Sequence, residues 1–223
     1  DDVLFSPLPT FHCFGLTAGA LLPLLGGMKS VLHPSPLQTK IIPKRVEETG
    51  ATFLFATDTF LNQYIRACTG NELGKLRYAV CGAERVRDET RQLVRRRFNV
   101  ELLEGYGATE AAPVISVNQP NHNHHGTVGR LLPGMEVMFE SVPGIEKGGR
   151  MLVRGPNVME GYLSPSKPGE LQKLPSGWHD TGDIVVQDDE GYLTIKGRLK
   201  RFAKIGGEMV SLAVVENCAS TLW

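Results

Sequence analysis

The chain lacks the features that would tie it to an oxidising compartment or to a bilayer. Its four cysteines stand far apart and form no C-x-x-C pair, so reduced thiols in the cytoplasm are the simplest interpretation. The longest apolar run, 16–27, is interrupted by Pro23 and is shorter than the roughly 20 residues of a membrane-spanning helix. No signal peptide stands at the start. Any membrane association is therefore expected to be peripheral and to come from other parts of a parent protein.

The chain also lacks an excess of charge and three common nucleotide or nucleophile motifs. Lys plus Arg and Asp plus Glu number 24 each, which argues against nucleic acid as a partner. Neither the phosphate loop G-x-x-x-x-G-K-[ST] nor the nucleophile elbow G-x-S-x-G occurs. A dinucleotide fingerprint starting at Gly105 would need glycine where Glu110 stands.

The chain has no polar lead-in at its start and stops inside an expected helix. It begins without Met in strand-like sequence, and it stops inside helix-like sequence at 213–223. We expect a fragment of a longer protein, with a processed but complete domain as the alternative. The hydrophobic content of 41% is enough for a packed core in either case.

Two patterns of periodicity indicate the fold class. Strand-like and helix-like segments alternate up to about residue 117, which predicts an α/β fold with a mainly parallel sheet and flanking helices. From 126 to 196 short strands and turns predict a small antiparallel barrel-like subdomain or a distorted sheet. The expected strands are 3–6, 30–32, 52–56, 76–81, 100–103, 137–139, 150–153, 183–186 and 192–195, and the expected helices are 15–25, 37–49, 58–69 and 87–98.

The segment EGYGATEA is the most informative stretch of the chain. Gly105 and Gly107 let a ligand approach the backbone, and Tyr106 offers a flat ring. Thr109 adds a hydroxyl, and Glu110 adds a carboxylate that can hold Mg²⁺. Together these residues indicate a nucleotide site.

Two further segments carry residues that suit a nucleotide, each with a simpler interpretation beside it. Gly82, Ala83 and Glu84 follow a strand and leave room for a flat ring next to the N–H groups of an expected helix start, or they form an ordinary strand-to-helix turn. Asp183 in HDTGD can accept hydrogen bonds from ribose hydroxyls, or it is a local backbone acceptor in a turn.

The basic stretch 197–208 is either a hinge that faces a phosphate or acyl group, or a solvated charge run.

Four of the six histidines are candidates for a functional role. His12 lies among aromatic residues and prolines, either as the polar point of an apolar pocket or as a packed core histidine. His122, His124 and His125 follow one another closely, but no cysteine or acid accompanies them, so we expect an exposed loop rather than a metal site.

The order of the motifs is more specific than any one of them. An FH-FG segment is followed by CGAE, EGYGATE, GTVGRLLPG, GWHDTGD and GRLKRFAKIGGEMVS. This succession resembles the adenylate-forming superfamily of acyl- and aryl-CoA synthetases, luciferases and adenylation domains over essentially the whole chain. Segments 35–37, 142–146, 201–205 and 208–212 are most similar to the synthetase half of the bacterial 2-acylglycerophosphoethanolamine acyltransferase/acyl-[acyl-carrier-protein] synthetase family.

The resemblance implies a reaction, partners and a location. ATP and a fatty acid give an acyl-adenylate, and acyl carrier protein then accepts the acyl group as a thioester. An upstream acyltransferase domain would pass it to a lysophospholipid. A fatty acyl-CoA ligase and a non-catalytic nucleotide- or lipid-binding module are the alternatives. The location would be the cytoplasm or the cytoplasmic face of the bacterial inner membrane.

The resemblance also implies domains: an α/β subdomain with the acyl and adenine site (1–125), a barrel-like subdomain (126–196), and a hinge with the truncated start of a small C-terminal domain (197–223). The phosphate loop would precede the chain and the carboxylate-activating lysine would follow it, so we expect this fragment of the large domain to be nearly inactive alone. The resemblance assigns roles by motif position. Around the nucleotide base and ribose, Gly82, Ala83 and Glu84 would line the adenine, Tyr106 between Gly105 and Gly107 would stack on it, and Asp183 and Arg198 would hold the ribose. Around the reacting groups, Thr109 would contact the α-phosphate, Glu110 would bind Mg²⁺ and His12 would lie near the acyl carboxylate, while Lys200 would be the hinge and Lys204 would serve thioester formation.

Overall fold

The structure is a computed structural model that describes residues 2–205 and 208–220. Its internal contacts divide the chain after Gly129 into two compact units, 1–129 and 130–223. The segment 197–223, which the sequence sets apart as a third region, is grouped with the second unit. Each unit is described by itself.

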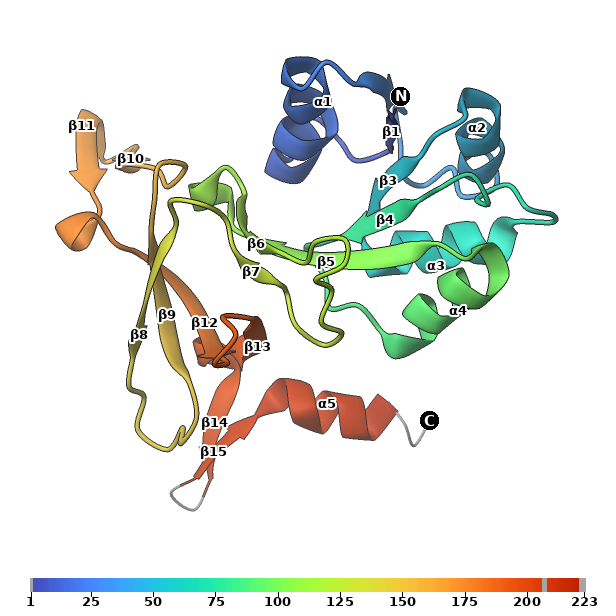
Figure 1. Cartoon of the computed structure of the whole chain (residues 1–223). Coiled ribbons are helices and arrows are strands. Elements are labelled where there is room, and N and C mark those ends of the chain that lie inside the picture. Colours follow the sequence, from blue (N-terminus) through green and yellow to red (C-terminus); the bar gives the residue numbers. More distant parts are fainter. Residues whose placement is uncertain (1, 206–207, 221–223) are drawn as a thin grey trace. The chain divides into compact units, whose positions relative to one another are not determined.

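The first unit is built on a mainly parallel sheet, as predicted (Figure 1). Its strands follow the order β2-β1-β3-β4-β5-β6, in which all neighbours are parallel except β5 and β6. The chain runs outward from β1 to β2 and then crosses back to β3, so strand order reverses beside β1. The bounds are β1 (Val3–Ser6), β2 (Lys29–Leu32), β3 (Phe53–Ala56), β4 (Tyr78–Cys81), β5 (Glu101–Gly107) and β6 (Val114–Val117).

Capping residues explain where the helices of this unit begin and end. α2 ends at Gly50, whose φ of 66° is the left-handed cap that the sequence indicates. The predicted start at residue 37 is wrong: the helix begins at Ile42 because Pro43, which lacks an N–H, suits only the first turn. The helices are η1 (Phe14–Leu21, a π-helix), α1 (Leu22–Leu25), α2 (Ile42–Thr49), α3 (Asp58–Ala67), α4 (Asp88–Phe98) and the 3-10 turn η2 (Thr109–Ala111).

Alternating side chains bury both faces of this sheet. In β3, Leu54 and Ala56 belong to the larger core cluster, which also contains buried residues of α2, α3 and α4. Phe53 and Phe55 point to the opposite face, where they pack with Ala18 of η1. The period of two along one strand therefore places helices on both sides, and Figure 1 shows α3 and α4 side by side on one of them.

The second unit is antiparallel. Its four-stranded sheet has the order β13-β12-β9-β8, and two hairpins, β10-β11 and β14-β15, accompany it. Asp188 makes the predicted turn between β12 and β13, where its carboxylate accepts from the N–H groups of Glu190 (3.0 Å) and Tyr192 (2.8 Å). The elements are β7 (Arg130–Leu131), β8 (Glu136–Glu140), β9 (Gly149–Arg154), β10 (Gly161–Ser164), β11 (Lys167–Lys173), η3 (Pro175–Gly177), β12 (His179–Gln187), β13 (Leu193–Arg198), η4 (Leu199–Arg201), β14 (Phe202–Ile205), β15 (Glu208–Ser211) and α5 (Leu212–Ser220).

Within residues 2–205 and 208–220, no helix has the length and apolar content needed to cross a bilayer.

Candidate functional site

The predicted nucleotide residues of the first unit gather at one edge of its sheet. Gly82 follows β4, and Tyr106 and Gly107 end β5, the parallel neighbour of β4. The segment from His12 to Phe14 follows β1, which runs in the same direction. Carboxyl ends of parallel strands meet at a common edge, which is where open α/β sheets bind ligands.

Contacts show that these segments lie against one another. A Cβ placed on Gly82 would lie 3.4 Å from the Gly105 carbonyl oxygen and 3.4 Å from Cε1 of Phe14. The Cys13 Sγ lies 3.5 Å from Oγ1 of Thr109. The segment predicted to be near the acyl group and the segment predicted to be near the phosphate are therefore neighbours in space.

The strand that carries Tyr106 is longer than the sequence indicates. β5 runs to Gly107, so the first part of EGYGATEA is strand rather than a loop after it, and Tyr106 pairs with Ser116 of β6. A Cβ on Gly107 would lie 2.2 Å from the Pro113 carbonyl oxygen, so glycine is required here by the close approach of two backbones. Tyr106 is half-buried.

Thr109 and Glu110 belong to the short turn η2 that follows β5. Thr109 is exposed and Glu110 is half-buried. A hydroxyl and a carboxylate that leave the sheet at its carboxyl edge suit a phosphate and its Mg²⁺, because Mg²⁺ commonly takes only one or two protein carboxylates beside substrate oxygens. No group of three His, Cys, Asp or Glu side chains that could hold a metal occurs among the described residues.

Glu84 differs from the sequence-based expectation. Its Oε2 accepts from the backbone N–H (3.0 Å) and the hydroxyl (2.7 Å) of Thr59, in the first turn of α3. The next helix, α4, begins only at Asp88, so the prediction of a helix start near Glu84 is wrong. Ala83 between Gly82 and Glu84 has a φ of 66° and is exposed, which turns the backbone sharply at the end of β4.

The four histidines that the sequence singles out are exposed. His12 is not a packed core residue, and its Nδ1 accepts from the backbone N–H of Phe14 at 3.2 Å. This bond holds the turn that brings Phe14 to Gly82. His122, His124 and His125 lie exposed in the loop after β6, as expected, and partial desolvation of the His125 ring, with the charge of Arg91, lowers its pKa.

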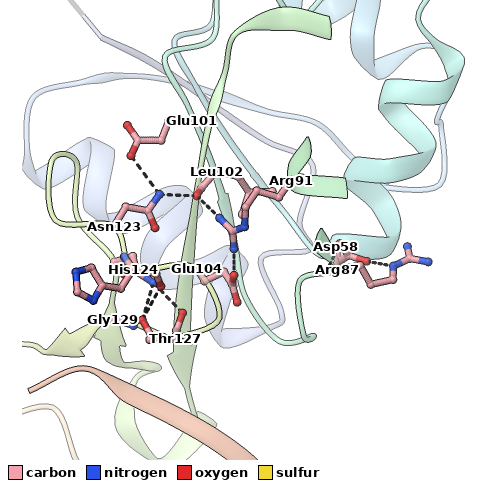
Figure 2. Close-up of polar contacts among 11 residues, drawn as sticks. Asp58, Arg87, Arg91, Glu101, Leu102, Glu104, Asn123, His124, Thr127 and Gly129 are labelled. Carbon is pink, nitrogen blue, oxygen red and sulfur yellow. Dashed lines mark hydrogen bonds and ion pairs between the residues drawn. The ribbon is translucent and has the colours of Figure 1, made fainter. Parts of the chain in front are cut away.

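Two ion pairs beside this edge were not predicted, one with both side chains buried and one in which only the carboxylate is buried. Arg91 of α4 contacts Glu104 of β5, and Arg87 donates to the buried Asp58 through Nε at 2.6 Å (Figure 2). A signal for the first pair was present in the sequence: Arg91 stands three residues before Val94 and seven before Phe98, on the buried stripe of the helix. A charged residue on such a stripe needs a buried partner.

In the second unit the two predicted ribose residues are cross-strand neighbours. Asp183 in β12 is opposite Arg198 in β13, and the Arg198 Nε lies 3.3 Å from Asp183 Oδ1. The Asp183 side chain is 6% exposed and that of Arg198 is 72% exposed, so the guanidinium extends from a buried carboxylate toward solvent.

The HDTGD segment is a strand with an irregular register rather than a simple turn. β12 shifts its register against β9 between Asp180 and Ile184. Asp180 Oδ1 accepts from the N–H of Gly182 at 2.9 Å, so the local backbone acceptor considered for Asp183 is Asp180. Bulged strands occur often beside functional sites because they redirect a side chain.

The two predicted lysines lie after β13. Lys200 is exposed in the short turn η4 between β13 and β14. Lys204 is in β14 opposite Met209, and its side chain lies outside the described part of the chain, as do residues 206–207.

Comparisons with known proteins show the family of this chain. A family model described as AMP-binding enzyme matches residues 1–163. The long-chain-fatty-acid–CoA ligase of Yersinia pestis is 32% identical over 218 residues, which are 92% of this chain and 38% of that protein. The indoleacetate–CoA ligase of Aromatoleum aromaticum is 31% identical, over 97% of this chain and 44% of its own length. The chain thus spans less than half the length of these curated relatives.

Solved structures show the same likeness. The O-succinylbenzoate coenzyme A synthetase of Bacillus subtilis in complex with ATP and magnesium ion superposes with a TM-score of 0.82 at 26% identity. The match covers 97% of this chain and 46% of that one.

Proposed function

The chain belongs to the AMP-binding enzyme family, and we propose that its parent protein is an ATP-dependent fatty acyl-CoA ligase. The observation that carries this proposal is the sheet edge where Gly82 after β4 and Thr109 after β5 meet the segment His12–Phe14. The residues that we assign to the adenine and the phosphate therefore lie beside the segment that we assign to the acyl group. Relatives that match almost the whole chain carry the names of fatty acid and aryl acid CoA ligases.

The reaction has two steps. A fatty acid carboxylate attacks the α-phosphorus of ATP, pyrophosphate leaves, and an acyl-adenylate forms. A thiol then attacks the acyl carbon, and AMP leaves. The first step builds negative charge on the α-phosphate, which Mg²⁺ and hydrogen-bond donors offset.

Each predicted residue has a role in this proposal. In the first unit the Gly82–Glu84 turn borders the adenine and Tyr106 stacks on it, while Thr109 donates to the α-phosphate and Glu110 binds Mg²⁺. Because the Glu84 carboxylate bonds to Thr59, we assign it the support of the turn rather than contact with the base.

The second unit supplies the remaining roles. Asp183 accepts from the ribose hydroxyls with Arg198 beside it, and the buried position of Asp183 keeps the acceptor in place. Lys200 in η4 is assigned to a hinge, because a short turn between two strand pairs is where backbone rotation disturbs few contacts. Lys204 is assigned to thioester formation.

Two versions of the proposal differ in the thiol that accepts the acyl group, which is that of coenzyme A or that of acyl carrier protein. The named relatives favour coenzyme A. Acyl carrier protein, with transfer onward to a lysophospholipid, rests only on the similarity of segments 35–37, 142–146 and 201–212 to one bacterial family. Full-length protein assayed with ATP, fatty acid and either acceptor distinguishes the two, and thioester formed on carrier protein but not on coenzyme A would reverse our choice.

The nucleotide part is tested on the chain itself by titration with AMP. Asp183→Asn keeps the volume of the side chain but removes its charge, so we expect weaker AMP binding at unchanged unfolding midpoint. Asp189→Asn, in the exposed turn after β12, is the matched control. Equal affinity of the Asp183 variant and the unmodified chain would refute the ribose assignment.

A further inference from the structure

A buried ion pair joins helix α4 to the strand that ends in the Gly105–Gly107 motif. Arg91 and Glu104 are in direct contact, and their side chains are only 8% and 9% exposed (Figure 2). The Arg91 Nη1 also donates to the Leu102 carbonyl oxygen at 2.9 Å. One guanidinium therefore holds β5 at Leu102 and at Glu104, and Glu104 directly precedes Gly105.

Before Gly105, side chains take the place of a neighbouring strand as hydrogen-bond partners of the β5 backbone. On that edge β6 pairs with β5 only from Gly105 onward. Before it, the Leu102 carbonyl accepts from Arg91 and also from Nδ2 of Asn123, at 2.9 Å each. The backbone N–H of Asn118 donates to the Glu104 carbonyl at 2.8 Å. Strand edges need partners for their buried polar groups, and here α4 and the loop after β6 provide them.

The loop that carries Asn123 is itself held in place. Asn118 Oδ1 accepts from the N–H of His124 at 3.0 Å, and Asn118 Nδ2 donates to the Thr127 carbonyl at 2.8 Å. Asn123 Nδ2 also donates to Glu101 Oε1 at 3.1 Å. Figure 2 shows the bonds of Asn123 to Glu101 and Leu102 beside the Arg91–Glu104 contact. The base of β5 is therefore fixed from two directions.

Stability alone does not account for a buried ion pair. Removing two charges from water costs several kcal/mol per ion, and well-packed apolar residues often stabilise a protein as much or more. The buried Arg91 Nε has no hydrogen-bond partner among the described residues. The guanidinium is thus oriented to contact β5 even though one of its N–H groups is left without a hydrogen bond. An ion pair with hydrogen bonds fixes the relative orientation of its two side chains, which contacts between apolar side chains do not.

We propose that Arg91 and Glu104 are positioning residues that fix the orientation of β5, and with it Tyr106, for nucleotide binding. Neither side chain is assigned a contact with the nucleotide. The inference rests on the proposed function in assigning the Tyr106 ring to the adenine. The positioning of the strand itself is a property of the chain without ligand.

The test separates stability from positioning. Arg91→Met leaves Glu104 buried and unpaired and lowers the urea midpoint, whereas the double variant Arg91→Met/Glu104→Leu recovers it. In that double variant we expect amide hydrogen exchange in the peptide 101–107 to be about tenfold faster, and AMP affinity to fall roughly 10- to 100-fold. Glu89→Gln, an exposed position on the same helix, is the control and changes neither.

Several outcomes decide the matter. A double variant with the original midpoint, exchange and AMP affinity overturns the proposal, because the pair would then only stabilise. If the double variant does not fold, Glu104→Gln, which preserves the side-chain volume, is measured in the same way, and unchanged exchange overturns the proposal too. If the unmodified chain does not bind AMP, the nucleotide assignment fails, and the exchange comparison still decides whether the pair orients β5.

Discussion

Gly107→Ala gives the sharpest test of the geometry at the sheet edge. The added Cβ would lie 2.2 Å from the Pro113 carbonyl oxygen and 2.8 Å from its carbon. That carbonyl cannot move aside freely, because it accepts from the N–H of Ala108 at 2.9 Å. Overpacking of this kind costs about 1–3 kcal/mol, and a clash between backbones belongs at the upper end. Alanine also lowers the conformational entropy of the unfolded chain, which stabilises the folded state by about 0.4–1 kcal/mol. The free energy of unfolding should therefore fall by roughly 2 kcal/mol in total.

Gly82→Ala is the matched comparison at the neighbouring strand. Its Cβ would meet the Gly105 oxygen and the Phe14 ring at 3.4 Å, which is ordinary contact. The unfolding free energy should therefore change by less than about 1 kcal/mol, while AMP affinity falls because the methyl group occupies space assigned to the base. Urea unfolding followed by circular dichroism measures the first quantity, and calorimetric titration with AMP measures the second. A Gly107 variant as stable as the Gly82 variant would refute the reasoning.

Three other predictions concern single residues. Burial opposes ionisation of Glu72, but hydrogen bonds from the preceding turn lower its pKa to about 2, so the stability that it contributes is present above pH 4.5 and is lost as the pH falls toward 2. Glu72→Gln should flatten the acid limb of the stability profile, and an unchanged limb would contradict this. Ala83→Gly relieves a φ of 66° and should stabilise the chain by about 0.5 kcal/mol in urea unfolding; a loss would count against it. Burial raises the pKa of the Cys81 thiol, so a thiol reagent at pH 8 should label Cys13 in the native chain and Cys81 only on unfolding.

The fold was largely predictable because its signals are local. Periodicity places β3, α3 and α4 within a few residues, and Gly50 marks the end of α2. The errors occur where distant residues decide. β5 continues past Leu103 because β6 pairs with it, and β12 includes HDTGD because it lies between β9 and β13. No local pattern reports such partners.

The sequence alone suggested which motifs make up the candidate site, but not which of its side chains contact one another. The sequence offers glycines, a ring, a hydroxyl and a carboxylate as candidates, and the family match covers the segments that carry them. It does not show that the Glu84 carboxylate is bonded to Thr59, nor that Arg91 holds the base of β5. Those contacts join residues 25 and 11 positions apart, and they depend on how helices pack on the sheet.

The sequence by itself determined the order of strands and helices, the change from parallel to antiparallel structure, and the family. These properties follow from side-chain periodicity, turn residues and motif order, all of which are written along the chain. Only the tertiary structure decided which polar groups meet: Asp183 with Arg198, Cys13 with Thr109, and Arg91 with Glu104. Such pairings require strands that are distant in sequence to be brought into register, because hydrogen bonds and ion pairs form only over a few ångströms.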